Sequence, residues 1–205
     1  MLSLPHFVPT PVFRLLGLVP PPHALVWVLP TEPGVDSALL VRPVPGRAFV
    51  LAIDVRGRRD PARARAWTAA VARLRERYGA PALLLAVCPD RATAAWAAGP
   101  FATGLGSWPS LSLRPLVLGP TDTPPVVTAP AASADLATAV LAALAHARGS
   151  RATAALAAVS EALRTAAPET RAYCTSLLTA GLGDGPASAA WGRLTELRRT
   201  VSGGR

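Results

Sequence analysis

Two aspartates on neighbouring candidate strands are the residues best placed for chemistry in this chain of 205 residues. Asp36 lies in VDSALLVR and Asp54 lies in RAFVLAIDV, and the PVPG segment between these runs predicts a hairpin turn. Centring the hairpin on Pro45 sets Asp36 opposite Asp54, with their Cβ atoms about 5 Å apart. Opposed carboxylates repel each other, and a divalent cation such as Mg²⁺ held between them would remove that conflict. Such a cation could also activate water for attack on a phosphate.

Arginines surround this pair. Arg56 lies two residues after Asp54 and so on the same side of its strand, where a guanidinium could hold a phosphate or orient the attacking water. Four more arginines at the entry and first turns of the next helix could contact nucleic-acid phosphates: Arg58, Arg59, Arg63 and Arg65. Two simpler interpretations stay open. The aspartates could be strand-end residues paired with Arg56 and Arg58, and the helix arginines could form a solvated face.

Composition narrows the classes of function. The formal net charge is +9, and the 21 basic residues are all arginine, a bias typical of GC-rich codon usage. The excess charge would attract a polyanion such as nucleic acid, although a generically basic surface explains it equally well. Three scattered histidines argue against a zinc site, and two distant cysteines in apolar surroundings predict buried free thiols. Neither a membrane span nor a secretion signal is apparent, so we expect a cytoplasmic protein.

Strands and helices must position the aspartate pair. A Pro-rich segment over residues 1–22 precedes a first strand at HALVWVL. After the pair, the Asp-Pro of RRDPARAR supplies an N-cap and a first helical residue, and Trp67 falls on the core face of the helix that follows. ALLLAVC predicts a buried strand, CPDRATAAWA a short helix, GLGS a flexible turn and LSLRPLVL a further strand. The mixed α/β core therefore spans 23–120, and we expect Trp96 and Trp108 to pack within it.

The composition changes after this core. A Pro/Thr/Ala-rich linker is expected over 121–133, followed by a helical region over 134–202. Its four Ala/Leu-rich helices are predicted at about 134–147, 151–166, 169–180 and 187–200. Their apolar stripes indicate either a bundle packed on the core or a surface for a homodimer.

These residues resemble the PD-(D/E)XK nuclease superfamily, which places an aspartate on one strand and acid-x-Lys on the next in an α-β-β-β-α-β core. Asp36 matches the first position, and Asp54-Val55-Arg56 matches the second. The phrases GRRDP, CPDRATAAWAAGP, WPSLSLRPLVLGP and GLGDGPASAAWGRL are similar to those of PD-(D/E)XK nuclease family transposases, or recombination-promoting nuclease-like proteins, of GC-rich bacteria. The resemblance covers about residues 30–197.

The resemblance implies a restriction-endonuclease-like mixed sheet flanked by helices, with a C-terminal four-helix appendage. It also implies a Mg²⁺-dependent DNA endonuclease in which Asp36 and Asp54 hold the metal. Arg56 stands where the family has Gln or Lys, and the family's acid-bearing N-terminal helix is shortened here, so Glu32 is the nearest further acid. Three hypotheses follow: a DNA phosphodiesterase or its descendant, a non-catalytic nucleic-acid-binding or protein-interaction module, and a scaffold reused for small-molecule chemistry.

Overall fold

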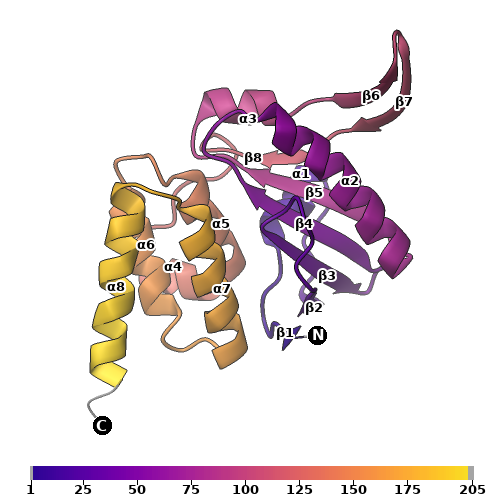
Figure 1. Ribbon diagram of the computed structural model, residues 1–205. Helices are drawn as coiled ribbons and strands as arrows, with labels where there is room; N and C mark the ends of the chain where they lie inside the picture. Colours follow the sequence, from indigo (N-terminus) through magenta and orange to yellow (C-terminus); the bar gives the residue numbers. More distant parts are fainter. Residues whose placement is uncertain (1, 203–205) are drawn as a thin grey trace.

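A computed structural model of the chain describes residues 2–202, and the side chains of residues 2–196. A mixed six-stranded sheet lies between two layers of helices (Figure 1). In sheet order, its strands are β1 (Leu2–Ser3), β2 (His23–Val28), β3 (Ser37–Val44), β4 (Phe49–Val55), β5 (Ala82–Val87) and β8 (Leu116–Leu118). Neighbours from β1 to β4 pair antiparallel, whereas β4, β5 and β8 run parallel. The mixed α/β class predicted from the sequence is confirmed.

Different helices cover the two faces of the sheet. Helices α2 (Pro61–Tyr78) and α3 (Arg91–Ala97) cover one face. The other face carries α1 (Thr10–Leu15), α4 (Ala129–Ala134), α5 (Leu136–Ala145), α6 (Ala152–Ala162), α7 (Pro168–Gly181) and α8 (Pro186–Ser202). Within residues 2–202, none of these helices is both long and apolar enough to cross a membrane.

The β3–β4 hairpin has the register predicted from its turn. Ala38 pairs with Ala52, and the ladder ends at Ser37 opposite Ile53. Both faces of β4 are buried. Ile53 and the residues that share its face of the strand pack among the C-terminal helices, whereas Ala52 and the residues on the opposite face pack under α2. Asp54 belongs to the second set, and this alternation directs its side chain toward α2.

Helix α2 begins and ends where the sequence predicts. The Asp60 side chain accepts hydrogen bonds from the backbone N–H groups of Ala62 and Arg63, as an N-cap does. Gly79 ends the helix with a φ of 59°, a left-handed conformation that glycine adopts without a steric cost. Trp67 is fully buried against the sheet. The start and the rotation of α2 are therefore fixed relative to β4.

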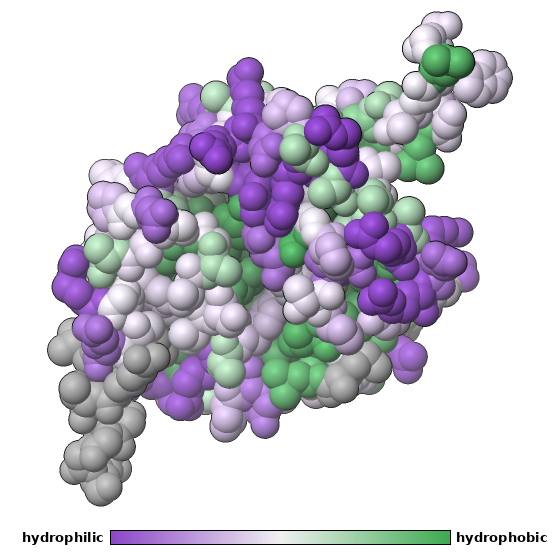
Figure 2. Space-filling model, viewed as in Figure 1, coloured by the Kyte–Doolittle hydropathy of each residue, from purple (hydrophilic) through white to green (hydrophobic). Residues whose placement is uncertain are grey.

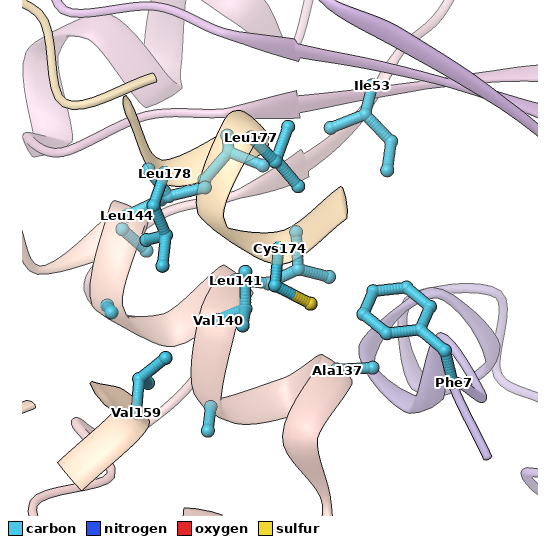
Figure 3. Close-up of a cluster of buried hydrophobic side chains, with 14 of the residues drawn as sticks. Phe7, Ile53, Ala137, Val140, Leu141, Leu144, Val159, Cys174, Leu177 and Leu178 are labelled. Atoms are coloured by element: carbon cyan, nitrogen blue, oxygen red, sulfur yellow. The ribbon is translucent and has the colours of Figure 1, made fainter. Parts of the chain in front are cut away.

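The C-terminal helices share one hydrophobic core with the sheet. Figure 3 shows Ile53 of β4 facing Leu177 and Cys174 of α7, with Leu141 of α5 beside them. Cys174, like Cys88 at the end of β5, is a buried free thiol, as predicted. In the described part of the chain, five helices (α4 to α8) follow the sheet, whereas four were expected. The additional helix is α4, which occupies the end of the segment predicted as a linker.

The segment LSLRPLVL is not one strand, and this corrects the prediction. Its first half belongs to β7 (Trp108–Leu113), which pairs with β6 (Phe101–Leu105) in a separate two-stranded hairpin. Pro115 separates β7 from β8, and only β8 belongs to the main sheet. Proline has no backbone N–H with which to continue a ladder. Trp96 packs in the core as expected, but the same expectation for Trp108 is wrong, because 77% of that residue is exposed.

Candidate functional site

The two aspartates lie at the carboxyl end of β4, on the face covered by α2. Asp54 is fully buried, whereas the side chain of Asp36 is 18% exposed. Asp36 directly precedes β3, and its Oδ2 accepts a hydrogen bond of 2.8 Å from the backbone N–H of Val55. This carboxylate therefore replaces a ladder acceptor at the point where β3 begins, which gives Asp36 a structural role in addition to any chemistry.

Two guanidinium groups bind both carboxylates. The Nε of Arg63 donates to both oxygens of Asp54 at 3.2 Å, and its Nη2 contacts Asp36 at 3.1 Å as well as Asp54. The Nη2 of Arg56 lies 3.1 Å from both oxygens of Asp36, and its Nε lies 2.7 Å from Asp54. We name Asp36, Asp54, Arg56 and Arg63 the compensated cluster, because two positive groups match two negative ones.

Trp67 supplies a further hydrogen bond to this cluster. Its indole Nε1 donates to Oδ2 of Asp54 at 2.8 Å. The apolar stripe of the helix predicts the packing of Trp67, but it does not reveal this contact. A usable signal was present, because Asp60, Arg63 and Trp67 follow one another at spacings of three and four residues, which share one face of a helix. A helix starting at Pro61 with Trp67 in the core must also turn Arg63 toward β4.

The electrostatics of the cluster follow from its burial. Desolvation raises the pKa of Asp54 above its ordinary value, and the nearby charge of Asp36 acts in the same direction. The hydrogen bond from Arg63 opposes both effects, and the same contact raises the pKa of Arg63. The two ion pairs thus stabilise a charge that burial disfavours. Removing one partner would leave an uncompensated charge in the interior.

The other arginines expected at this site do not join the cluster. Three of them are exposed: Arg58, Arg59 and Arg65. Arg58 was expected to pair with the aspartates, but Arg63 forms these ion pairs instead. Arg63 was predicted to contact nucleic acid, and in the structure its guanidinium binds the two aspartates. The expected pairing of Arg56 with the aspartates is confirmed.

The aspartate pair, as arranged, does not fit the divalent metal that the resemblance implies. Both carboxylates are already bound by guanidinium groups, which cannot act as metal ligands. Glu32, the nearest further acid in the sequence, is buried and pairs instead with Arg73 at 2.5 Å and Arg77 at 3.3 Å. Among residues 2–196, no three His, Cys, Asp or Glu side chains gather in a group suited to a metal ion.

A groove of about 530 Å³ lies beside the cluster, at the carboxyl ends of β4 and β5. Three arginines line it: Arg56 from the cluster, Arg58 from the loop before α2, and Arg148 from the turn after α5. Gly57 allows the close approach of Arg148, because a Cβ at this position would lie 3.2 Å from the Arg148 Nη2. Parallel strands commonly place ligands at their carboxyl ends, so the groove occupies a favourable position.

Other acids limit the positive charge of the groove. Arg148 lies 2.7 Å from Asp90, and Asp60 and Asp184 line the same space. The side chain of Arg148 is nevertheless 58% exposed, and Arg58 is exposed beside it. The combined arrangement is suited to binding an anion through guanidinium groups at the mouth of the groove.

Comparison with known proteins adds no family to this description. No family model, no curated protein and no solved structure matches the chain.

Proposed function

We propose that the chain is a nucleic-acid-binding module on a restriction-endonuclease-like core, and that it binds the phosphate backbone without cleaving it. The observation that carries the proposal is the arginine-lined groove beside a carboxylate pair whose charge is already matched. In an active metal-dependent nuclease, the carboxylates must be free to hold a cation. Here arginines occupy them, and the groups that the groove leaves open to a ligand are the exposed guanidinium groups of Arg58 and Arg148.

Phosphate recognition is the chemistry that this groove supports best. A guanidinium donates two parallel hydrogen bonds to a phosphate, and Arg58 and Arg148 present such groups to solvent. Arg59 and Arg65 are exposed on the loop before α2 and on its first turns, where they extend the same basic surface. The net charge of +9 would speed the approach of a polyanion.

Cleavage lacks a suitable general base in the cluster. An arginine stays protonated under physiological conditions, so Arg56 can neither accept a proton from water nor replace a lysine in that role. Each oxygen of Asp54 already accepts hydrogen bonds from Arg63, and Oδ2 accepts another from Trp67. The groups needed to activate water are therefore engaged in holding the fold.

Fluorescence anisotropy with labelled DNA at several salt concentrations tests the proposal. We expect binding that weakens with salt, and Arg58→Ala or Arg148→Ala should each lower the salt slope by about one. Arg47→Ala is the matched control, because this exposed arginine precedes β4 and lies at the opposite end of the strand from Asp54. No binding by the wild type, or equal losses from all three substitutions, would contradict the proposed groove.

A Mg²⁺-dependent endonuclease is the second candidate, and one contact favours it. The Nη2 of Arg63 touches both Asp36 and Asp54, so the two carboxylates converge on a single cation. If nucleic acid drew Arg63 away, a metal ion could compete for the same oxygens. Plasmid nicking with Mg²⁺ or Mn²⁺ decides the matter. Activity that disappears in both Asp36→Ala and Asp54→Ala would replace the binding proposal with this one.

The small-molecule hypothesis receives less support from the cavities. A cavity of about 170 Å³ reaches Asp36 but not Asp54, and its other walls come from the end of β2 and the loop after it, the start of β3, and α7. This volume is below the roughly 300 Å³ at which ligand pockets of proteins begin. We therefore do not propose small-molecule chemistry at the aspartate pair.

A further inference from the structure

A two-stranded hairpin projects from the body of the molecule. Strands β6 and β7 extend beyond the layer of α2 and α3, as Figure 1 shows. Every residue from Ala102 to Ser112 is exposed, including Leu105 at 88% and Trp108 at 77%. Neither strand pairs with the main sheet. The outer part of the hairpin therefore adds little to the folded core.

The chemistry of the hairpin differs from that of the surface around it. Residues 101–113 include no charged side chain, whereas the formal net charge of the chain is +9. In Figure 2 the projecting hairpin is mostly pale with green hydrophobic patches, while strongly hydrophilic residues gather over α2 and α3 near its base. We name Leu105, Trp108 and Leu111 the hairpin tip, because these are its exposed large apolar residues.

The base of the hairpin is anchored in the same core that holds the cluster. The centroid of the Phe101 ring lies 5.6 Å from the ring centroid of Trp67 and 5.4 Å from that of Trp96. Trp67 in turn donates to Asp54. Near the tip, Gly104 sits at a register shift where a Cβ would come within 2.0 Å of the backbone oxygen of Trp108. A side chain at position 104 would therefore disrupt the pairing of the two strands next to Trp108.

We propose that the hairpin tip contacts nucleic-acid bases, with Trp108 stacking on a base and Leu105 packing beside it. The proposal rests on the nucleic-acid binding inferred above and adds the element that would touch bases. Exposed aromatic rings stack on unpaired bases regardless of sequence, because every base has a π-face. A two-stranded ribbon is also narrow enough to enter the major groove of a duplex. The arginines of α2 and its entry loop would meanwhile hold the backbone.

A lipid surface is the competing partner for an exposed tryptophan and leucine. Membrane affinity grows with the apolar area that is inserted, and stable anchoring requires more than one modest apolar group. The hairpin tip offers three apolar side chains, and Leu111 is only 48% exposed. A single tryptophan can by contrast contribute substantially to nucleic-acid binding through one stacked base. The small size of the tip thus favours bases over lipid.

Titration of three labelled probes tests the proposal: single-stranded DNA, duplex DNA, and an abasic strand with the same backbone. We expect Trp108→Ser to weaken binding to single-stranded DNA by about ten-fold or more, and Trp108→Phe to retain most of the affinity. The salt slope should stay unchanged, because no phosphate contact is lost. Binding of the abasic strand should not depend on Trp108. Val19→Ser is the control, since Val19 is 90% exposed in another part of the surface.

The outcomes separate this proposal from the one on which it rests. If the wild type binds no probe, the proposed function fails. If the wild type binds and Trp108→Ser binds equally well, only the role of the hairpin tip is overturned. Trp108-dependent binding to phosphatidylglycerol vesicles, without an effect on DNA, would assign the tip to lipid instead. A change from dimer to monomer in Trp108→Ser, again without an effect on DNA, would assign it to a second copy of the chain.

Discussion

The compensated cluster and the hairpin tip place their side chains in opposite environments. In the cluster, each charged group meets a partner in the interior, and Asp54 is fully buried. At the tip, Leu105 and Trp108 pair across the two strands and are left in solvent, and contiguous exposed apolar side chains commonly mark interaction sites. Folding explains the first arrangement. It does not explain the second, because the tip packs against nothing in the described part of the chain.

This difference separates side chains that hold the fold together from side chains that are free to contact a ligand. Opposed carboxylates repel each other, which made the aspartate pair a candidate for chemistry in the sequence. In the structure, Arg56 and Arg63 neutralise this repulsion. The pair therefore contributes to stability as it stands. The exposed arginines and the hairpin tip contribute little to the fold, so they are the stronger candidates for contact with a ligand.

The largest expected effect is on stability, from Asp54→Ala. Removing this carboxylate leaves Arg63 and Arg56 without their shared buried partner, and breaking a buried ion pair in this way costs about 3–5 kcal/mol. Urea denaturation of the two proteins measures the loss. Asp184→Ala, at an exposed acid of the groove, should change the free energy of unfolding by less than about 0.5 kcal/mol. Equal stability of the Asp54 variant and the wild type would contradict the structural role.

Arg63→Ala should have a smaller effect and also reveal a metal response. The substitution uncovers oxygens of both aspartates, and we expect it to cost about 1–3 kcal/mol. Because two carboxylates would then share one remaining guanidinium, millimolar Mg²⁺ should raise the melting temperature of the variant more than that of the wild type. Thermal melts with Mg²⁺ and with matched ionic strength from NaCl distinguish a specific effect from screening. An equal rise of the melting temperature in the two proteins would argue against convergence of the two carboxylates on one cation.

The hairpin tip should tolerate substitution without loss of stability. Trp108→Ser removes a side chain that packs against no core residue, so the free energy of unfolding should change by less than about 0.5 kcal/mol. Trp67→Phe provides the contrast, because it removes the hydrogen bond to Asp54 and leaves space in the core. Denaturation curves of both variants test the comparison. A large loss from Trp108→Ser would show that the tip packs against a surface of its own or another chain.

The two thiols should show no measurable reaction in the folded protein. Burial raises the pKa of both Cys88 and Cys174 to about 12, and neither side chain reaches solvent. Because the thiolate is the reactive form, a thiol with so high a pKa stays protonated at neutral pH. Mass spectrometry after alkylation should find no modified cysteine in the native protein and two after unfolding in urea. Rapid labelling of either thiol in native buffer would contradict the packing around it.

Local signals explain what could be predicted from the sequence. The turn at PVPG and the alternation of β4 set the hairpin register, and the Asp-Pro pair with Gly79 set the bounds of α2. The contact of Arg63 with the aspartates was not predicted, because it depends on the placement of α2 over β4. The exposure of Trp108 was also missed, since a strand pattern does not reveal whether another element covers it. Pro115 predicted an edge or a bulge within one strand, but it separates two strands that belong to different sheets.

Anisotropy of fluorescently labelled DNA, followed over time with the wild-type protein in millimolar Mg²⁺, tests the central claim most directly. Binding without cleavage predicts a rise in anisotropy that then stays constant, and that falls when salt is added. The absence of any rise would contradict nucleic-acid binding. A rise that decays toward the value of short fragments would show cleavage and contradict binding without cleavage.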